Sequence, residues 1–274
     1  MRLKQSILLL TLCLCSHASI AGFQKDSKQL SRAQQVWEQA IVAKGGRTRL
    51  ESVRSIFISQ RSKYWHGLKK YEVFSEELTV FPGKSWSWTD YRPDVFGLTV
   101  EMHNFDRGIK YFSNADVPPP QPHAISGYET VVSHTYGLLG YLMETKWLKP
   151  KVMGLDEATL GKRKVDVVHT LLKDDVEGFL SEDLYIDFSI DRKTHLAVRV
   201  RYSRMKFGEK GSWNEITVSG YVDVNGIKVP LDETIEGVTG RISVQLNVNY
   251  DEGLFSKPPS IAAGPEAWRV KKSR

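Results

Sequence analysis

The chain has 274 residues, of which 41% are hydrophobic, 26% charged and 11% aromatic, with 21 glycines, 11 prolines and 2 cysteines. This composition is typical of a globular protein and excludes a disordered tail protein, a collagen-like fibre and a disulfide-rich scaffold. The formal net charge of +6 is a small basic excess spread along the chain, which does not by itself indicate nucleic-acid binding.

The first 21 residues have the pattern of a secretory signal peptide. Arg2 and Lys4 form a basic start, residues 7–15 form a short apolar run, and small residues precede the expected cleavage point. Both cysteines lie in this segment, so the mature chain is expected to have no disulfide, no thiol nucleophile and no cysteine metal ligand. We therefore expect export through a cleavable signal peptide, most simply to a bacterial periplasm.

Two segments show helical periodicity. Between residues 30 and 41, apolar side chains recur on one face of a helix, and a Gly-Gly pair follows as a C-terminal cap. A second helix is predicted over residues 127–146, because Ser126 and Glu129 form a capping box before a wide apolar surface.

Most of the remaining chain alternates apolar and polar residues with a period of two, which indicates antiparallel strands. The alternation is clear at residues 196–202 and 242–250, and less regular strands are predicted at 55–65 and 70–81. Asn225-Gly226 is a strong signal for a type I′ hairpin.

These elements predict an α+β fold: a strongly curved antiparallel sheet that forms an incomplete β-barrel of about ten or eleven strands and is covered by two helices. A single domain over residues 22–274 is expected, because no Gly- or Ser-rich linker and no internal repeat divides the chain. The polar, basic tail over residues 262–274 is expected to be loose.

The sequence has no local catalytic signature: no Gly-x-Ser-x-Gly, no P-loop, no Gly-x-Gly-x-x-Gly and no His-Glu-x-x-His motif. No two histidines of the mature chain lie within four residues of each other, so no local metal site is indicated. His169 shares the apolar face of its predicted strand with Val165, Val167 and Leu171, which favours a histidine in the core or in a cavity wall. We expect no catalytic residue, no metal and no cofactor.

Basic and aromatic residues are interleaved most closely at Trp65, His66, Lys69, Lys70 and Tyr71. This run is the nearest approach to a nucleic-acid-binding pattern in the chain, and it is weak evidence for one. No nucleic-acid partner is expected.

A curled sheet with one apolar face needs a cover, and the two helices then enclose either a packed core or an apolar cavity. The inward-facing residue types suit acyl chains, although core filling is the simpler interpretation from composition alone. The residues expected to line a cavity are Trp86, Trp88, Leu98, Val100, Met102, Tyr136, Leu139, Leu142, Val167, Ile186, Phe188, Val198, Val200, Val244 and Leu246.

Several short motifs, most of them rich in turn-forming residues, follow one another along the mature chain. They are Ala43-Lys44-Gly45-Gly46 with Leu50, Val53 and Ser55; residues 104–110; Tyr185-Ile186-Asp187 with residues 191–198; the hairpin at 220–230; and Asn249, Leu254-Phe255 and Pro258. In this order they resemble the periplasmic lipoprotein-carrier superfamily, the LolA/LolB-like fold, and especially its exported members similar to outer membrane lipoprotein-sorting proteins.

The resemblance implies an incomplete β-barrel with a helical lid and a hydrophobic cavity for acyl chains, and no catalysis. Tyr136, Leu139 and Leu142 are then expected on the lid. The expected function is a periplasmic binder or carrier of a lipid or lipidated protein, with peripheral contact to a membrane. Two alternatives stay open: an envelope module with a packed core that binds a protein partner, and a hydrolase or metal enzyme whose residues are assembled across strands.

Overall fold

The structure is a computed structural model. It describes residues 27–66, 69–92, 97–104, 107–113, 123–126, 138–172, 183–205, 213–235, 237–256 and 264–270. The predicted signal peptide and most of the second predicted helix, including Tyr136, lie outside these residues.

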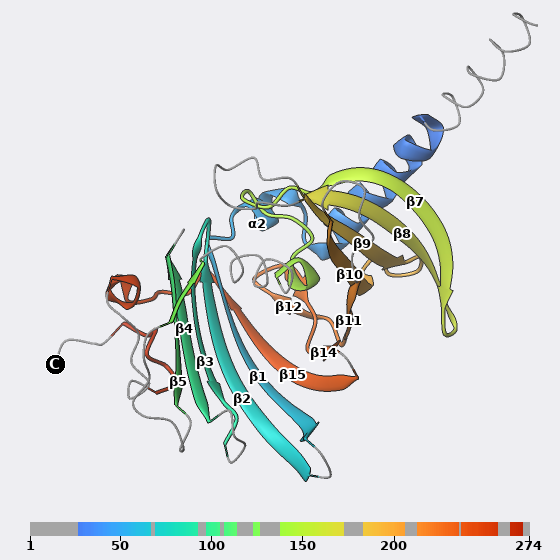
Figure 1. The fold of residues 1–274 in the computed structure, drawn as a ribbon. Helices are drawn as coiled ribbons and strands as arrows, with labels where there is room; N and C mark the ends of the chain where they lie inside the picture. The colour runs from blue at the N-terminus through green and yellow to red at the C-terminus, as the bar shows by residue number, and fades with distance from the viewer. Residues whose placement is uncertain are drawn as a thin grey trace, which may run out of the picture.

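Strands make up most of the described chain (Figure 1). They are β1 (Ser55–His66), β2 (Lys69–Val80), β3 (Lys84–Asp90), β4 (Leu98–Asn104), β5 (Arg107–Ser113), β6 (His123–Ser126), β7 (Lys151–Leu160), β8 (Arg163–Leu172), β9 (Asp183–Asp191), β10 (Ala197–Met205), β11 (Asn214–Ser219), β12 (Val222–Val224), β13 (Ile227–Val229), β14 (Asp232–Ile235) and β15 (Val238–Leu246). Short helices are α2 (Arg47–Glu51) and the 3-10 turn η1 (Glu252–Phe255).

Thirteen of the strands form one antiparallel sheet in the order β6-β5-β4-β3-β2-β1-β15-β14-β11-β10-β9-β8-β7, and β12 pairs with β13 separately. The sheet is curved and open, because β6 and β7 lie at opposite edges (Figure 1). The prediction of an antiparallel sheet is confirmed, but the expected ten or eleven strands are too few. Among the additional strands, β6 and β14 have only four residues each and are too short to show a period of two, whereas the longer β7 and β11 are not identified from their patterns.

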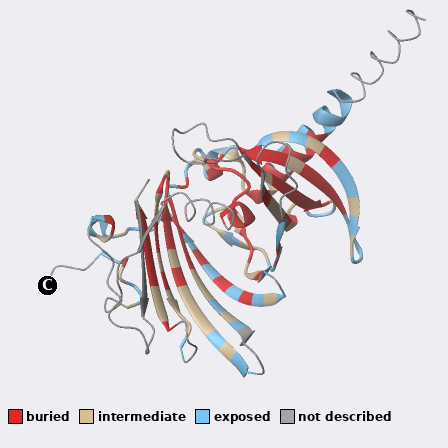
Figure 2. Cartoon of the chain, viewed as in Figure 1, coloured by how far each residue is buried: buried red, intermediate tan, exposed pale blue. Residues whose placement is uncertain are grey.

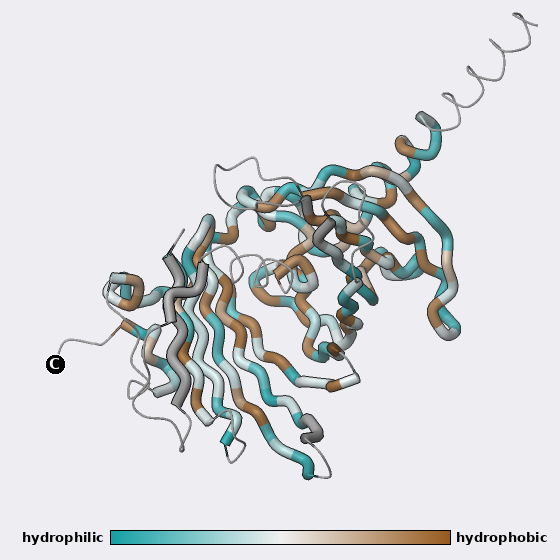
Figure 3. Tube along the Cα trace, viewed as in Figure 1, coloured by the Kyte–Doolittle hydropathy of each residue, from teal (hydrophilic) through white to brown (hydrophobic). Residues whose placement is uncertain are grey.

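Buried and exposed residues alternate strictly along β15 (Figure 2). The same alternation appears in hydropathy (Figure 3), so β15 has one apolar and one polar face. The predicted hairpin is also confirmed: Asn225 and Gly226 have φ values of 54° and 80°, as a type I′ turn requires.

The first predicted helix is confirmed over residues 27–44, which are called the N-terminal helix below. Its buried residues Ala33, Val36, Trp37, Ala40 and Ile41 lie on one face, as the periodicity predicts. Among the described residues, no helix combines the length and the apolar character needed to cross a membrane.

The second predicted helix ends earlier than expected, at residue 141 instead of 146. Thr145 Oγ1 accepts hydrogen bonds from the backbone amides of Trp147 and Leu148, at 3.2 and 3.1 Å. A threonine that bonds local backbone in this way competes with the helical pattern and favours a turn. Residues 138–149 are called the cover below; they lie between the two arms of the curved sheet (Figure 1).

The C-terminal tail is not loose throughout. Trp268 is buried, its carbonyl accepts a hydrogen bond of 2.9 Å from the amide of Asp251, and its ring lies 4.2 Å from that of Phe57. The polar, basic composition predicts a solvated tail, but one large aromatic residue is enough to attach this part of it to the sheet.

Candidate ligand-binding face

The sheet has an inner face, which packs against the N-terminal helix and the cover, and an outer face on the opposite side. Directly opposed residues of antiparallel strands have their side chains on the same face, so the register assigns faces across the sheet. Ile58 of β1 belongs to the inner cluster. Its register partners, Val244 on β15 and Glu77 on β2, therefore share the inner face.

The inner face is mostly apolar from β8 across β15 to β1, with the carboxyl of Glu233 on β14 as an exception. Val168, Phe188 and Val200 lie opposite one another on β8, β9 and β10 and are fully buried. Trp37 of the N-terminal helix packs edge-on against Phe188, with ring centroids 5.1 Å apart. Each buried side chain of this kind stabilises the fold by about 1.5–3 kcal/mol, so this surface holds the helix against the sheet.

Beyond β1 the inner face becomes polar. Two rows of opposed residues cross β2, β3 and β4: Thr79, Ser85 and His103 in one, and Glu77, Ser87 and Glu101 in the other. Ser85, His103 and Glu101 are buried, and His103 Nε2 lies 2.9 Å from Glu101 Oε1. The inner face thus has an apolar half and a polar half, with the boundary at β1.

A buried carboxylate on β14 joins the cover to the sheet. Glu233 lies opposite Gly240 on the inner face, and the hydroxyl of Tyr141 donates a hydrogen bond to it. Burial raises the pKa of the Glu233 carboxyl, and the nearby charge of Glu77 raises it further. Burial also raises the pKa of Tyr141. The cover therefore meets β14 through a contact that favours protonated groups.

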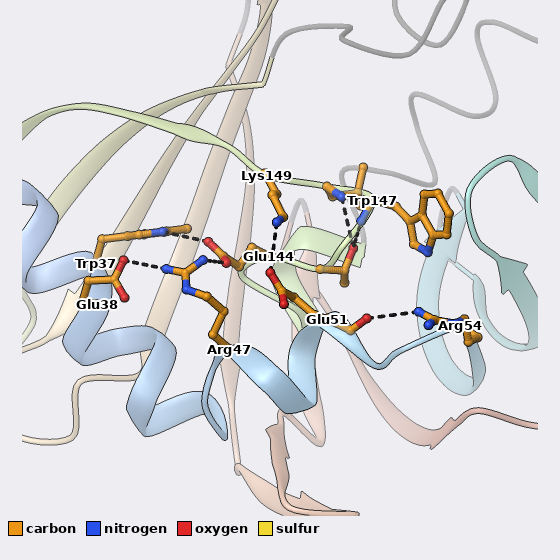
Figure 4. A network of polar contacts seen from close by, with 10 residues as sticks. Trp37, Glu38, Arg47, Glu51, Arg54, Glu144, Trp147 and Lys149 are labelled. Carbon is orange, nitrogen blue, oxygen red and sulfur yellow. Dashed lines mark hydrogen bonds and ion pairs between the residues drawn. The ribbon is translucent and has the colours of Figure 1, made fainter.

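Polar contacts also attach the end of the cover to the N-terminal helix and α2 (Figure 4). Buried Glu144 accepts a hydrogen bond of 3.2 Å from Trp37 Nε1 and forms an ion pair with Arg47. Lys149 Nζ lies 3.0 Å from Glu51. Burial raises the pKa of Glu144 more than Arg47 and Trp37 lower it. The cover is thus fixed at both ends of its apolar surface by side chains that are distant in sequence.

The N-terminal helix ends at a buried lysine. Lys44 is 1% exposed, and its Nζ lies 4.9 Å from the centre of the Tyr221 ring. Burial lowers the pKa of Lys44 to about 7. At Gly45, φ is 140° and a Cβ would lie 2.4 Å from the carbonyl oxygen of Gly226. Glycine therefore allows the helix end to contact the β12–β13 hairpin, and the Ala-Lys-Gly-Gly motif acts in packing.

The predicted cavity residues are divided between clusters on the two faces of the sheet. The inner cluster holds Leu139, Leu142, Ile186, Phe188, Val200, Val244 and Leu246. A second cluster, on the outer face beneath Phe255 and Trp268, holds Trp86, Trp88, Val100 and Met102, with Leu98 at its margin. Val167 and Val198 belong to a third cluster, with Val165. Contact with a ligand stays a prediction for these residues, and a ligand on the inner face would contact only those of the inner cluster.

His169 belongs to an ion network on the outer face. Its Nδ1 lies 2.7 Å from Asp187 and its Nε2 lies 3.1 Å from Asp156, while Arg201 binds the other oxygen of Asp187 at 2.6 Å. The hydrogen bond to Asp187 is the main cause that raises the pKa of His169. His169 also borders a groove of about 680 Å³ between the start of the N-terminal helix and β7. Within the described ranges, no group of three or more His, Cys, Asp or Glu residues is placed to hold a metal ion.

Sequence reasoning does not single out the polar half of the inner face. A signal for it exists, because Ser85, Ser87 and Thr89 alternate with Trp86 and Trp88 along β3. The alternation shows that one face of β3 is polar and the other apolar. It does not show that the C-terminal segment covers the apolar face, which leaves the polar face directed inward.

No family model matches the chain, and no curated protein matches it. The chain is similar to a solved DUF1329 family protein from Desulfovibrio piger, with 12% identity and a TM-score of 0.48 over 81% of this chain and 96% of that one. It is also similar to a LolA superfamily protein from Nitrosomonas europaea, with 9% identity and a TM-score of 0.46 over 82% and 97% of the two chains. A domain described as an outer membrane lipoprotein-sorting protein, from Vibrio parahaemolyticus, gives 10% identity and a TM-score of 0.43 over 84% and 97%. A LolA superfamily protein is thus among the structures to which this chain is similar.

Proposed function

We propose that the protein is an exported, non-enzymatic binder or carrier of a lipid or a lipidated protein in the periplasm. The curved sheet would act as an incomplete barrel, and the acyl chain would lie on the apolar half of its inner face. The polar headgroup would then lie toward β2, β3 and β4.

The observation that carries this proposal is the division of the inner face at β1. Ile56 and Ile58 end the apolar half, and Thr79 and Glu77 beside them begin the polar half. An amphiphile has one apolar and one polar end, so both of its ends match such a surface. A uniformly apolar or uniformly polar ligand would leave one half unmatched.

A second candidate function is an envelope module that binds a protein partner and has a filled core. It is favoured by Leu139, Leu142 and Met143 of the cover, which are fully buried against the apolar half. In the carrier proposal these side chains move aside when an acyl chain enters. In the alternative they stay in place.

A pair of variants on one strand tests the carrier proposal. Val200 belongs to the inner cluster and Val198 to the third cluster, and both are buried on β10. Val200→Phe adds volume where the acyl chain would lie, whereas Val198→Phe adds the same volume elsewhere. We expect Val200→Phe to weaken binding of a dansyl-labelled fatty acid at least tenfold, and Val198→Phe to leave the dissociation constant unchanged.

Thermal melting of both variants is the control, because overpacking costs about 1–3 kcal/mol at either position. If both variants remain folded and bind the probe equally, the acyl chain does not lie on the inner face. If the unmodified protein does not bind the probe at all, the partner-binding module is the better account.

A further inference from the structure

The hairpin formed by β1 and β2 extends beyond the rest of the sheet. β15 pairs with β1 only as far as Ser62, and β3 pairs with β2 only from Phe74 onward. In the described ranges, Lys63–His66 and Lys69–Glu72 therefore pair only with each other. Residues 61–74 are called the hairpin tip below; the tip forms the lower end of the molecule in Figure 1.

Folding alone does not account for this extension. A two-stranded ribbon is marginally stable in water unless it packs against something else. Lys69, Lys70 and Glu72 are exposed in the tip, so these three side chains bury little surface. The outer edges of the two strands also present backbone groups that invite pairing with other chains. These costs indicate a role for the tip outside folding.

The hairpin tip is basic. Its four basic residues and one acidic residue give a formal charge of +3. Lys63 forms an ion pair with Glu72 at 3.1 Å, and the Arg61 guanidinium lies 5.4 Å from the centre of the Phe74 ring. A groove of about 490 Å³ beside these residues is lined by Arg61, Lys63 and Phe74, among others. The charge of the tip is complementary to an anionic surface.

Aromatic residues accompany the basic ones. The sequence of the tip contains Tyr64, Trp65 and Tyr71, and Phe74 at its base packs edge-on against Trp88 with ring centroids 5.9 Å apart. Tyr and Trp are enriched where proteins meet the headgroup region of a bilayer, and lysines near that region are attracted to anionic lipids. An acidic protein surface would match the positive charge of the tip, but it does not explain why tyrosine and tryptophan accompany the lysines.

We propose that the hairpin tip docks on the surface of a bilayer that contains anionic phospholipids. The inference deepens the proposed function, on which it rests, because it names the surface where a carrier would collect or release its lipid. Each basic side chain near such a surface strengthens binding by about fivefold. The contact of a tip with a formal charge of +3 is therefore reversible and sensitive to salt.

Lysines on exposed strand edges also have a structural use, because they discourage pairing with other chains. In that case, removing them would make the protein associate with itself without changing how the monomer binds a membrane. The experiment therefore has to distinguish lysines that prevent strand pairing from lysines that bind anionic lipid.

Co-sedimentation with vesicles tests the proposal. The purified protein is mixed with vesicles of phosphatidylcholine, with or without phosphatidylglycerol, at low and high salt. We expect binding that requires phosphatidylglycerol and is lost at high salt. Lys69→Gln with Lys70→Gln should weaken it by about twenty-fivefold, from two lysines at about fivefold each.

Two further variants serve as controls. Lys162→Gln with Lys164→Gln removes the same charge from exposed positions in the β7–β8 turn and at the start of β8, and should leave binding unchanged. Lys69→Glu with Lys70→Glu keeps the strand edge charged, so it should stay monomeric in gel filtration and yet lose binding.

Equal binding to both kinds of vesicle, or full binding by the Lys69→Glu, Lys70→Glu protein, would overturn the proposal. Failure to bind either vesicle would also overturn it, and would leave an acidic protein surface as the partner of the tip. The fatty-acid probe is measured without vesicles, so a failure of the carrier proposal appears there independently. The lysine variants should bind that probe normally.

Discussion

Lys44, Glu144 and Glu233 are buried at contacts between elements: Lys44 beside Tyr221, Glu144 between the cover and the N-terminal helix, and Glu233 between the cover and β14. Burial disfavours the charged form of each group, so it lowers the pKa of the amine and raises the pKa of both carboxyls. Partners offset part of this cost: Arg47 and Trp37 for Glu144, and the Tyr141 hydroxyl for Glu233. The ammonium group of Lys44 lies over the face of the Tyr221 ring, which is a cation–π contact.

Lys44→Met is expected to stabilise the protein at pH 7 by an amount on the order of 4 kcal/mol. The pKa of Lys44 falls from 10.5 in the unfolded chain to about 7 in the fold. Between these values the unfolded chain binds more protons, so the stability of the unmodified protein should rise with pH from 7 to 10.5. Methionine fills a similar volume without a charge, and the variant should lose this part of the pH dependence. Urea unfolding across this pH range measures both effects; a variant that is less stable at every pH would contradict the account.

At the scale of elements, the sequence predicts the helices and strands that are determined by nearby residues, such as a helical period or a turn. The N-terminal helix follows from its period, and the β12–β13 hairpin follows from Asn225 and Gly226, since few other residues adopt two successive positive φ values. The end of the second helix depends on Thr145 and on the tertiary contact of Glu144 with Arg47, which no local pattern reveals.

The junction of the N-terminal helix and the β12–β13 hairpin offers a matched pair of variants. Gly45→Ala is expected to destabilise the protein by about 2 kcal/mol or more, because its Cβ would overlap the carbonyl oxygen of Gly226. Gly46 also has a positive φ of 88°, but no atom lies within 4 Å of the position that a Cβ would take there. Gly46→Ala should therefore show only the backbone strain. Equal losses in urea unfolding would mean that the close approach to Gly226 does not matter.

At the scale of the whole molecule, the apolar face changes sides along the sheet. Phe188 and Val200 are buried on the inner face, whereas Trp86 and Met102 are buried on the outer face beneath the C-terminal segment. Alternation in the sequence identifies every one of these strands as two-faced. It does not state which face is covered, because the covering segments come from distant parts of the chain. This is why the predicted cavity residues are distributed over both faces.

The C-terminal segment should therefore contribute to global stability. Trp268 is 4% exposed and stacks on Phe57, so Trp268→Ala is expected to cost about 3–5 kcal/mol. Val270, two residues further on, is 56% exposed, and Val270→Ala should be close to neutral. Thermal melting compares the two variants. A loose tail, as its composition suggests, would give two neutral results.

The most direct test of the central claim is native mass spectrometry of the protein purified from its own envelope fraction, before and after organic extraction. The account predicts a bound species of lipid mass that extraction removes and that an added fatty acid replaces. It would be contradicted by a bare protein mass that stays unchanged when fatty acid is added. In that case the apolar half of the inner face is a filled core, and the protein acts by binding a protein partner.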